Sequence, residues 1–185
     1  MLIDISPPIG PSLAVWPGDS PVTREVLLEL ARGDSVTLST LRATVHLGAH
    51  ADAPSHYGID APDIAARPLD VYLGPCEVIR VEVERGHLVV PGMLQAAPRA
   101  PRVLFATGTY PDPARFSEDF AALSPELVDH LHAAGVRLVG LDTPSVDPFA
   151  SKRLEAHRRF LANDMAILEG LVLEGVQEGM YELIV

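Results

Sequence analysis

The apolar positions of this chain recur mostly at every second residue, which is the period of a β-strand. In the segment 76–84, Ile79, Val81 and Val83 alternate with charged side chains. Because neighbouring side chains of a strand point to opposite faces, this alternation is typical of a strand with one buried face. The same pattern, or a short apolar run rich in β-branched residues, predicts further strands at 2–6, 21–30, 35–46, 102–107, 136–142, 165–173 and 179–185.

Helices are fewer, and the first one is marked at both ends. Ser124 is a good N-cap, Pro125 occupies the first helical position and Gly135 ends the helix. A second helix is expected at 150–164 and a short third one at 91–97. Between these elements the 17 prolines mark many defined turns, which excludes a long helical bundle.

Strands with interspersed helices predict an α/β fold. We expect one domain, residues 1–185, because this length and a hydrophobic content of 48% suffice to bury a substantial core. The expected architecture is a curved, barrel-like mixed sheet flanked by a few helices. The order of the strands in that sheet does not follow from the pattern.

Charge and composition limit the partners and the compartment. The net charge of −11 repels a polyanion, and no basic stripe with interleaved aromatic residues offsets it, so we expect no nucleic-acid partner. No apolar run reaches the roughly 18–20 residues that span a bilayer, so no membrane span is expected. The first ten residues lack the basic and apolar blocks of a signal peptide, and Cys76 is the only cysteine. Both features favour the cytoplasm.

Three of the seven histidines gather in one segment, residues 44–58, which reads TVHLGAHADAPSHYG. His46 is expected at the end of a strand, and His50, Asp52 and His56 follow among small residues. Small residues predict an irregular segment that can fold closely around an ion. Imidazole and carboxylate groups suit Zn²⁺, Mn²⁺ or Fe²⁺, and the lack of cysteine here argues against a structural zinc site. Ordinary turn hydrogen bonds are the alternative, but four such side chains at this spacing favour a metal.

Two more polar side chains are expected inside the fold. His157 shares a helix face with Leu154 and Leu161 and therefore points inward. Glu169 lies in an apolar strand, where a carboxylate is costly unless it is paired or bound to a cation. An inward histidine is more often a core residue than a ligand. A metal cluster would nevertheless give both groups a common partner.

These residues together resemble the cyclase-like metal-dependent hydrolases, and most closely the bacterial kynurenine formamidases (arylformamidases). The similarity covers nearly the whole chain in order, through the motifs DISPPIGPSLAVWPGD, HLGAHADAPSHY, PLDVYLGPC, LVGLDTPSVDP and LEAHRRFLANDMAILEGLVLEGVQEGMYELI. It implies the swivelling β/β/α fold of these enzymes. It also implies a homodimer and two divalent ions per chain, usually zinc, with manganese as the alternative.

The resemblance also assigns roles to single residues. The metal ligands correspond to His46, His50, Asp52, His157 and Glu169. Asp52 and Glu169 carry the carboxylates that could bridge the ions. His56 matches the histidine assigned to proton transfer, and Trp16 matches an aromatic residue that contacts the substrate. Without the resemblance, the single tryptophan would be read as a core residue.

The implied reaction is hydrolysis of N-formyl-L-kynurenine to L-kynurenine and formate, a step of tryptophan degradation. A metal-bound hydroxide would attack the formyl carbon, and His56 would pass a proton to the leaving nitrogen. A metal lowers the pKa of bound water from about 15.7 to about 7, a larger effect than the ~10²–10⁴-fold of a general base. Two alternatives remain open. One is hydrolysis of another amide, lactam or ester on the same scaffold, as in an isatin hydrolase with manganese, and the other is metal binding without catalysis.

Two features depart from the family pattern. The sequence ends at Val185, where relatives usually continue with a further segment, and Leu47 stands where they commonly carry threonine. The segment 142–148 is expected to line the pocket. Its Asp142 and Asp147 fit a turn equally well and are therefore left outside the site.

Overall fold

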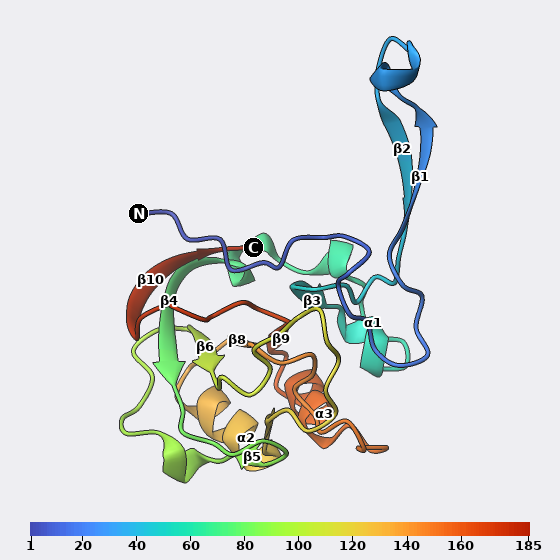
Figure 1. Ribbon diagram of the computed structural model, residues 1–185. Coiled ribbons are helices and arrows are strands. Elements are labelled where there is room, and N and C mark those ends of the chain that lie inside the picture. Colours follow the sequence, from blue (N-terminus) through green and yellow to red (C-terminus); the bar gives the residue numbers. More distant parts are fainter.

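The computed structural model describes all residues, 1–185, and is built around one six-stranded sheet (Figure 1). The four inner strands are parallel, and the two edge strands run antiparallel to their neighbours. In spatial order the strands are β10 (Gly179–Ile184), β4 (Leu73–Arg80), β6 (Arg102–Ala106), β8 (Leu138–Leu141), β9 (Ala166–Glu169) and β3 (His50–Asp52). A mixed sheet flanked by a few helices confirms the predicted α/β fold. The two edge strands, β10 and β3, do not pair with each other, so the sheet is open.

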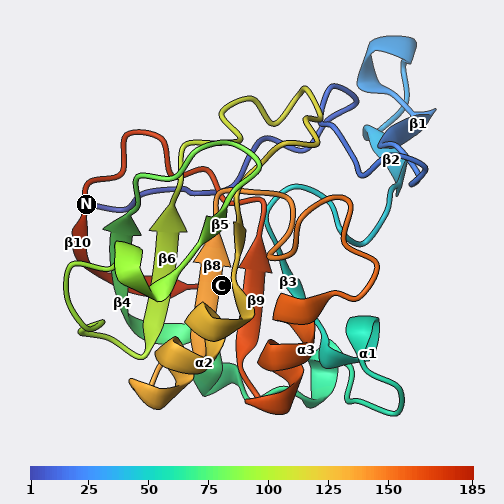
Figure 2. The same ribbon diagram turned by 90° about the horizontal axis from the view of Figure 1, so that it is seen from below.

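The two longer helices, α2 (Pro125–Ala133) and α3 (Glu155–Ala162), cover the same face of the sheet (Figure 2). The parallel strands follow one another across the sheet in chain order, and crossovers between parallel strands are right-handed, so all of them fall on one side. The core between these helices and the sheet includes the fully buried Phe105, Leu127 and Phe160. Next to α2, β5 (Leu88–Val89) pairs in parallel with β7 (Ala122–Leu123).

The helix ends agree only partly with prediction. The Ser124 hydroxyl accepts a hydrogen bond from the backbone N–H of Leu127 at 3.1 Å, which confirms the predicted cap. The second helix begins at Glu155 instead of residue 150, and the third is a single 3₁₀ turn, η4 (Pro91–Met93). The remaining short helices are η1 (Leu30–Arg32), α1 (Pro54–Tyr57), η2 (Ile64–Ala66) and η3 (Leu69–Val71). None of the helices is both long and apolar enough to cross a membrane.

The N-terminal segment 2–6, predicted as a strand, is irregular. It makes a single backbone–backbone hydrogen bond, from the N–H of Val172 to the carbonyl of Ile5 at 2.8 Å. Apolar alternation therefore did not suffice, because no strand lies alongside this segment to complete a ladder.

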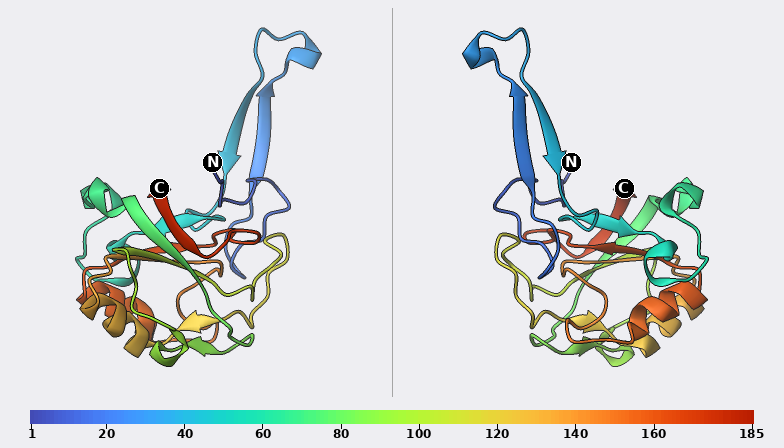
Figure 3. Two further views of the ribbon diagram at one scale, coloured as in Figure 1. Left: turned by 90° about the vertical axis from the view of Figure 1, so that its left-hand side faces the viewer. Right: turned by 90° about the vertical axis from the view of Figure 1, so that its right-hand side faces the viewer.

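A two-stranded hairpin projects away from the body (Figures 1 and 3). It consists of β1 (Thr23–Leu28) and β2 (Leu38–Arg42). The predicted strand 35–46 thus ends at Arg42, before His46, and its apolar face is not buried, since Leu41 and Val45 are 58% and 85% exposed. The hairpin pairs only with itself, so neither of its faces meets a core.

Candidate metal centre

The segment around His50 was predicted to be irregular, and this is wrong. Residues His50–Asp52 form the edge strand β3, and His56 lies in the helical turn α1. His50 stands directly opposite Glu169 in the antiparallel pair, and Asp52 lies two residues further on the same face. The strand register therefore gathers three polar side chains at one point.

Small residues make this pairing possible where β9 ends. Gly170 has φ +69°, and a Cβ at this position would collide with the carbonyl of Gly48. The N–H of Gly170 donates to the carbonyl of Thr143 at 2.8 Å. The glycine that follows Glu169 thus lets the loop before β3 come close enough to bring His50 and Asp52 into place.

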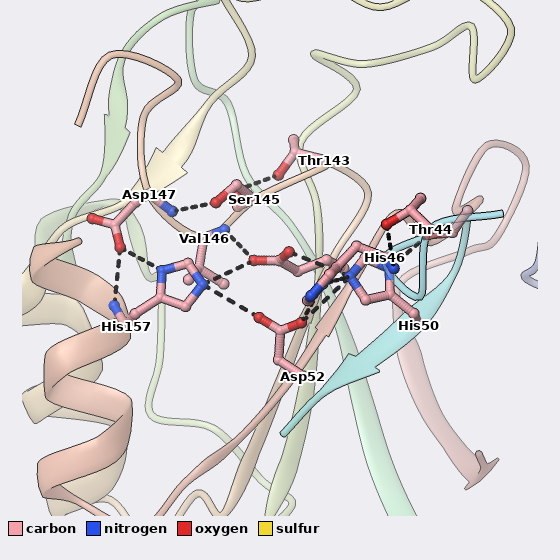
Figure 4. A network of polar contacts seen from close by, with 11 residues as sticks. Thr44, His46, His50, Asp52, Thr143, Ser145, Val146, Asp147 and His157 are labelled. Atoms are coloured by element: carbon pink, nitrogen blue, oxygen red, sulfur yellow. Dashed lines mark hydrogen bonds and ion pairs between the residues drawn. The ribbon is translucent and has the colours of Figure 1, made fainter. Parts of the chain in front are cut away.

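Two further histidines complete the cluster, one on each side of Asp52 (Figure 4). His46 lies in the loop after β2, and its Nδ1 is 3.0 Å from Asp52 Oδ1. His157 comes from α3, and its Nε2 is 3.4 Å from Asp52 Oδ2 and 3.6 Å from Glu169 Oε1. His50 Nε2 is 3.4 Å from Asp52 Oδ1 and 3.7 Å from Glu169 Oε2. All five predicted ligands therefore converge, and Asp52 belongs to two groups of three.

His157 points inward as predicted, but not beside the predicted neighbours. It is buried together with Ala156 and Phe160, whereas Leu161 is 36% exposed and Leu154 precedes the helix. The helix begins later than expected, so Leu154 no longer shares its face.

Asp147 fixes the orientation of His157, a role that the sequence reading missed. One of its carboxylate oxygens accepts from His157 Nδ1 at 2.7 Å and from the backbone N–H of His157 at 3.0 Å. The other accepts from the N–H of Ala156 at 3.0 Å. His50 is oriented in the same way, by a contact of 2.9 Å between its Nδ1 and the carbonyl of Gly48. In both rings the Nε2 atom is left facing the carboxylates, as metal-ligating histidines require.

The chemistry of the cluster fits a divalent cation. Both carboxylate oxygens of Asp52 and the Nε2 of His157 are buried and lack a hydrogen-bond partner. His46 Nδ1 and His50 Nε2 are 3.0 Å apart. Ligand atoms of a tetrahedral zinc site with Zn–N bonds of 2.0–2.1 Å lie about 3.3 Å apart, close to these separations. Nitrogen and oxygen ligand atoms thus stand around shared points, and only His46 and His50 form a hydrogen bond with each other there.

Without a bound cation, protons alone balance the charges of the cluster, and this shifts the pKa values of its members. Burial raises the pKa of Glu169, and the nearby Asp52 carboxylate adds to this, giving about 7. Burial lowers the pKa of His157, but Asp147 and Asp52 outweigh it and raise the value to about 10. Burial also opposes ionisation of Asp52, yet the surrounding imidazoles hold its pKa well below the usual range. Binding a cation here would therefore release protons.

A cavity of about 260 Å³ opens beside the cluster. His46 and His50 form one part of its wall, and the aromatic Trp16, Tyr110 and Phe116 form another. The ring of Trp16 lies 5.4 Å from that of Phe116 between centroids, so the tryptophan belongs to an aromatic wall. Asp142 and Pro144 also line the cavity, as expected for the segment 142–148.

His56 and Asp142 lie near the cluster but outside the group of five predicted ligands. His56 is exposed and is not part of the cavity lining; its ring centroid is 4.0 Å from that of His46 and 6.3 Å from that of His157. Asp142, read as a turn residue, accepts hydrogen bonds from the N–H groups of Thr107 and Gly108 at 2.8–3.0 Å. Its charge is thus bound to the backbone beside the cavity.

Comparison with known proteins identifies similar sequences and folds. A family model described as "Putative cyclase" matches residues 3–148. The structure of a potential metal-dependent hydrolase with cyclase activity superimposes with a TM-score of 0.79 over 97% of this chain and 85% of its own, at 23% sequence identity. A predicted metal-dependent hydrolase from Bacillus stearothermophilus superimposes with a TM-score of 0.78 over 97% of this chain and 86% of its own, at 24% sequence identity. Isatin hydrolase A from Labrenzia aggregata, bound to benzyl benzoate, superimposes with a TM-score of 0.77 over 96% of this chain and 84% of its own, at 20% sequence identity. At these identities the likeness establishes a shared fold.

Proposed function

Because the chain belongs to the cyclase family, we propose that it is a metal-dependent hydrolase that cleaves an amide bond to an aryl nitrogen. The substrate we propose is N-formyl-L-kynurenine, which would give L-kynurenine and formate, so that the enzyme is an arylformamidase of tryptophan degradation. One observation carries the proposal. Buried, unpartnered donor atoms of Asp52 and His157 lie in a cluster whose histidines His46 and His50 form the wall of an aromatic cavity.

The donor set supports two divalent ions, with zinc as the expected metal and manganese as the alternative. His46, His50 and Asp52 would hold one, and Asp52, His157 and Glu169 the other. Such ions, when bound, lower the pKa of water and polarise a carbonyl group. The protein itself supplies fixed ligand orientation through Asp147 and a site largely closed to solvent around Asp52.

The remaining site residues act on the organic substrate. Trp16, Tyr110 and Phe116 would hold the aryl ring and keep water from its faces. His56 would move a proton at an imidazole nitrogen to the departing aryl nitrogen. Its place beside His46, together with its contact with solvent, supports this role, since a proton must be renewed after each turnover.

A second candidate is hydrolysis of a cyclic aryl amide such as isatin. The matched isatin hydrolase structures favour it, because they share this fold over 91–96% of the chain. The deciding experiment measures kynurenine release from N-formyl-L-kynurenine by metal-supplemented protein, with a chelated control and isatin in parallel. Chelator-sensitive release of kynurenine supports the first reading. Turnover of isatin alone supports the second, and no turnover of either by metal-loaded protein favours metal binding without catalysis.

We also infer a homodimer, formed through the projecting hairpin. An isolated two-stranded hairpin is at best marginally stable in water. This one exposes the apolar Leu27, Leu30, Val36, Leu38 and Leu41 at 50–62%. The chain carries a net charge of −11, but Arg24, Arg32 and Arg42 balance Glu25, Glu29 and Asp34 in the hairpin. Two copies can therefore meet at this neutral, apolar part without strong repulsion.

Two further inferences concern the chain as a whole. We take residues 1–185 to form one domain, because both core clusters pack against the same sheet. A cytoplasmic location is supported by the single cysteine, Cys76, which is a buried free thiol.

A further inference from the structure

The cavity beside the metal centre extends along the edge of the sheet where the parallel strands end. The arrowheads of β4, β6 and β9 point to this edge (Figure 2). Glu169 ends β9, Asp142 follows β8, Gly108 follows β6 and Arg80 ends β4. Asp142, Gly108 and Arg80 all line the cavity, so it reaches from the metal ligands to β4. Ligands of open α/β sheets bind at this carboxyl edge.

Arg80 is the only lysine or arginine in the wall of this cavity. Its guanidinium makes one hydrogen bond, from Nη2 to the carbonyl of Val176 at 3.3 Å, and no ion pair. The backbone N–H of Arg80 donates to Glu178, which leaves the side chain out of that contact. Most of the five donors of this guanidinium thus stay free for a carboxylate, which arginine binds in a bidentate manner.

Glu174 is the complementary charge. It lines the same cavity, is exposed, and makes no ion pair or hydrogen bond through its side chain. The other carboxylate in the wall, Asp142, is occupied by the N–H groups of Thr107 and Gly108. Val176, two residues after Glu174, accepts the hydrogen bond from Arg80, so neighbouring segments of the wall offer one free cation and one free anion.

We propose that Arg80 and Glu174 bind the α-amino-acid end of the substrate, with Arg80 taking the carboxylate and Glu174 the ammonium. This rests on the proposed function and selects, among aryl amides, those with a zwitterionic tail. N-formyl-L-kynurenine has such a tail, whereas isatin has none. The pair would thus be the feature that distinguishes the two candidate substrates.

The dimensions agree with this assignment. A cavity of about 150 Å³ accommodates benzene, and the 260 Å³ here leaves room for a tail beyond one aromatic ring. Three strand spacings of about 4.8 Å, roughly 14 Å, separate β4 from β9. Seven bonds join the formyl carbon of N-formylkynurenine to its carboxyl carbon, at most about 9 Å when extended. The side chains of Arg80 and of the metal ligands reach in from both ends and shorten the gap.

The kinetic test compares two formamides on the metal-loaded protein. N-formyl-L-kynurenine carries the tail, and N-(2-acetylphenyl)formamide lacks it. Arg80→Gln should raise the KM of the first about 10–100-fold, the usual range for a charged hydrogen bond, and leave its kcat within about threefold. The KM of the second should not change. Arg137→Gln, which removes an exposed charge just before β8, at the opposite end of the parallel strands, should affect neither substrate.

The same contrast between the two substrates decides the outcome. An equal loss on both substrates, or no loss on either, would overturn the proposal, and the carboxylate would then lie elsewhere, for instance at the metal end. Glu174→Gln should weaken binding of L-kynurenine but not of 4-(2-aminophenyl)-4-oxobutanoate, which keeps the carboxylate and lacks the ammonium. Equal weakening of both would remove Glu174 from the assignment.

A binding measurement separates this proposal from the proposed function. If the wild-type protein hydrolyses neither formamide, the arylformamidase proposal fails, but calorimetry with L-kynurenine and 2-aminoacetophenone still tests the tail site. The wild type should prefer L-kynurenine, and Arg80→Gln should abolish the preference. No binding of L-kynurenine, no preference, or a preference that survives in Arg80→Gln would each refute the role of Arg80.

Discussion

Replacing Asp147 by asparagine tests whether His157 is a metal ligand whose ring is oriented by the hydrogen bond from its Nδ1 to Asp147. Asp147 lies outside the ligand set, and its three hydrogen bonds of 2.7–3.0 Å hold both the ring of His157 and the first turn of α3. Asparagine keeps the size and one acceptor oxygen but loses the charge. The bond to His157 Nδ1 then weakens, and the ring is free to rotate or to change tautomer.

The expected loss follows from the role of such supporting groups. Removing one typically lowers metal affinity 10–100-fold, which corresponds to about 1.4–2.8 kcal/mol. His157 is 3% exposed and has no other partner for Nδ1, so we expect the upper part of this range. The measurement is a zinc titration of the protein against a chelator of known affinity.

Asp142→Asn is the matched control. This aspartate is also buried and also accepts backbone N–H groups, but it touches no metal ligand. Its zinc affinity should stay within about twofold of the wild type. An Asp147→Asn protein with wild-type affinity, or an Asp142→Asn protein that loses as much, would refute the assignment of His157.

Three further predictions concern catalysis, assembly and the thiol. His56→Ala should lower kcat about 10²–10⁴-fold with unchanged metal content by atomic absorption, and joint loss of metal and activity would count against a separate proton-transfer role. Leu38→Asp with Leu41→Asp should shift the protein to monomer in sedimentation velocity, whereas Ile59→Asp with Leu69→Asp, at exposed apolar residues outside the hairpin, should not. Burial raises the pKa of Cys76 to about 12, so its thiol stays protonated at pH 8 and should react with a thiol reagent only as fast as the protein opens. Fast labelling of the folded protein at pH 8 would refute this protection. The raised pKa of Cys76 also stabilises the folded state below pH ~8.5, where the unfolded thiol is neutral too, and this stabilisation is lost as the pH rises towards 12.

Features that depend on neighbouring residues could be predicted from the sequence. The inward side of His157 and the Ser124 cap followed from neighbouring residues, and the spacing of His46, His50 and Asp52 marked them as candidate ligands. The convergence of distant segments could not follow from them. Asp147 lies ten residues before His157 and looks like any aspartate in a proline-rich turn, so only the fold reveals their contact.

The errors have a common physical cause. The segment 2–6 and the end of the predicted strand 35–46 carry the right alternation but lack a neighbouring strand, while the glycine- and alanine-rich segment around His50 gained one. Strand formation depends on a partner at least as much as on propensity. In this chain the partner of β3 is β9, more than 100 residues away, and nothing in the local sequence indicates it.

The short edge strand β3 links the stability of the fold to the candidate metal centre. It has three residues, and a slip of one residue would turn His50 and Asp52 to the opposite face. Hydrophobic burial alone restrains such a slip weakly, because Ala51 is the only apolar residue of the strand. The close contact between Gly48 and Gly170 adds a restraint, and a cation held by the candidate ligands around Asp52 would add another. A cation that binds only the correct register stabilises it by mass action, so the site and the strand that carries it support each other.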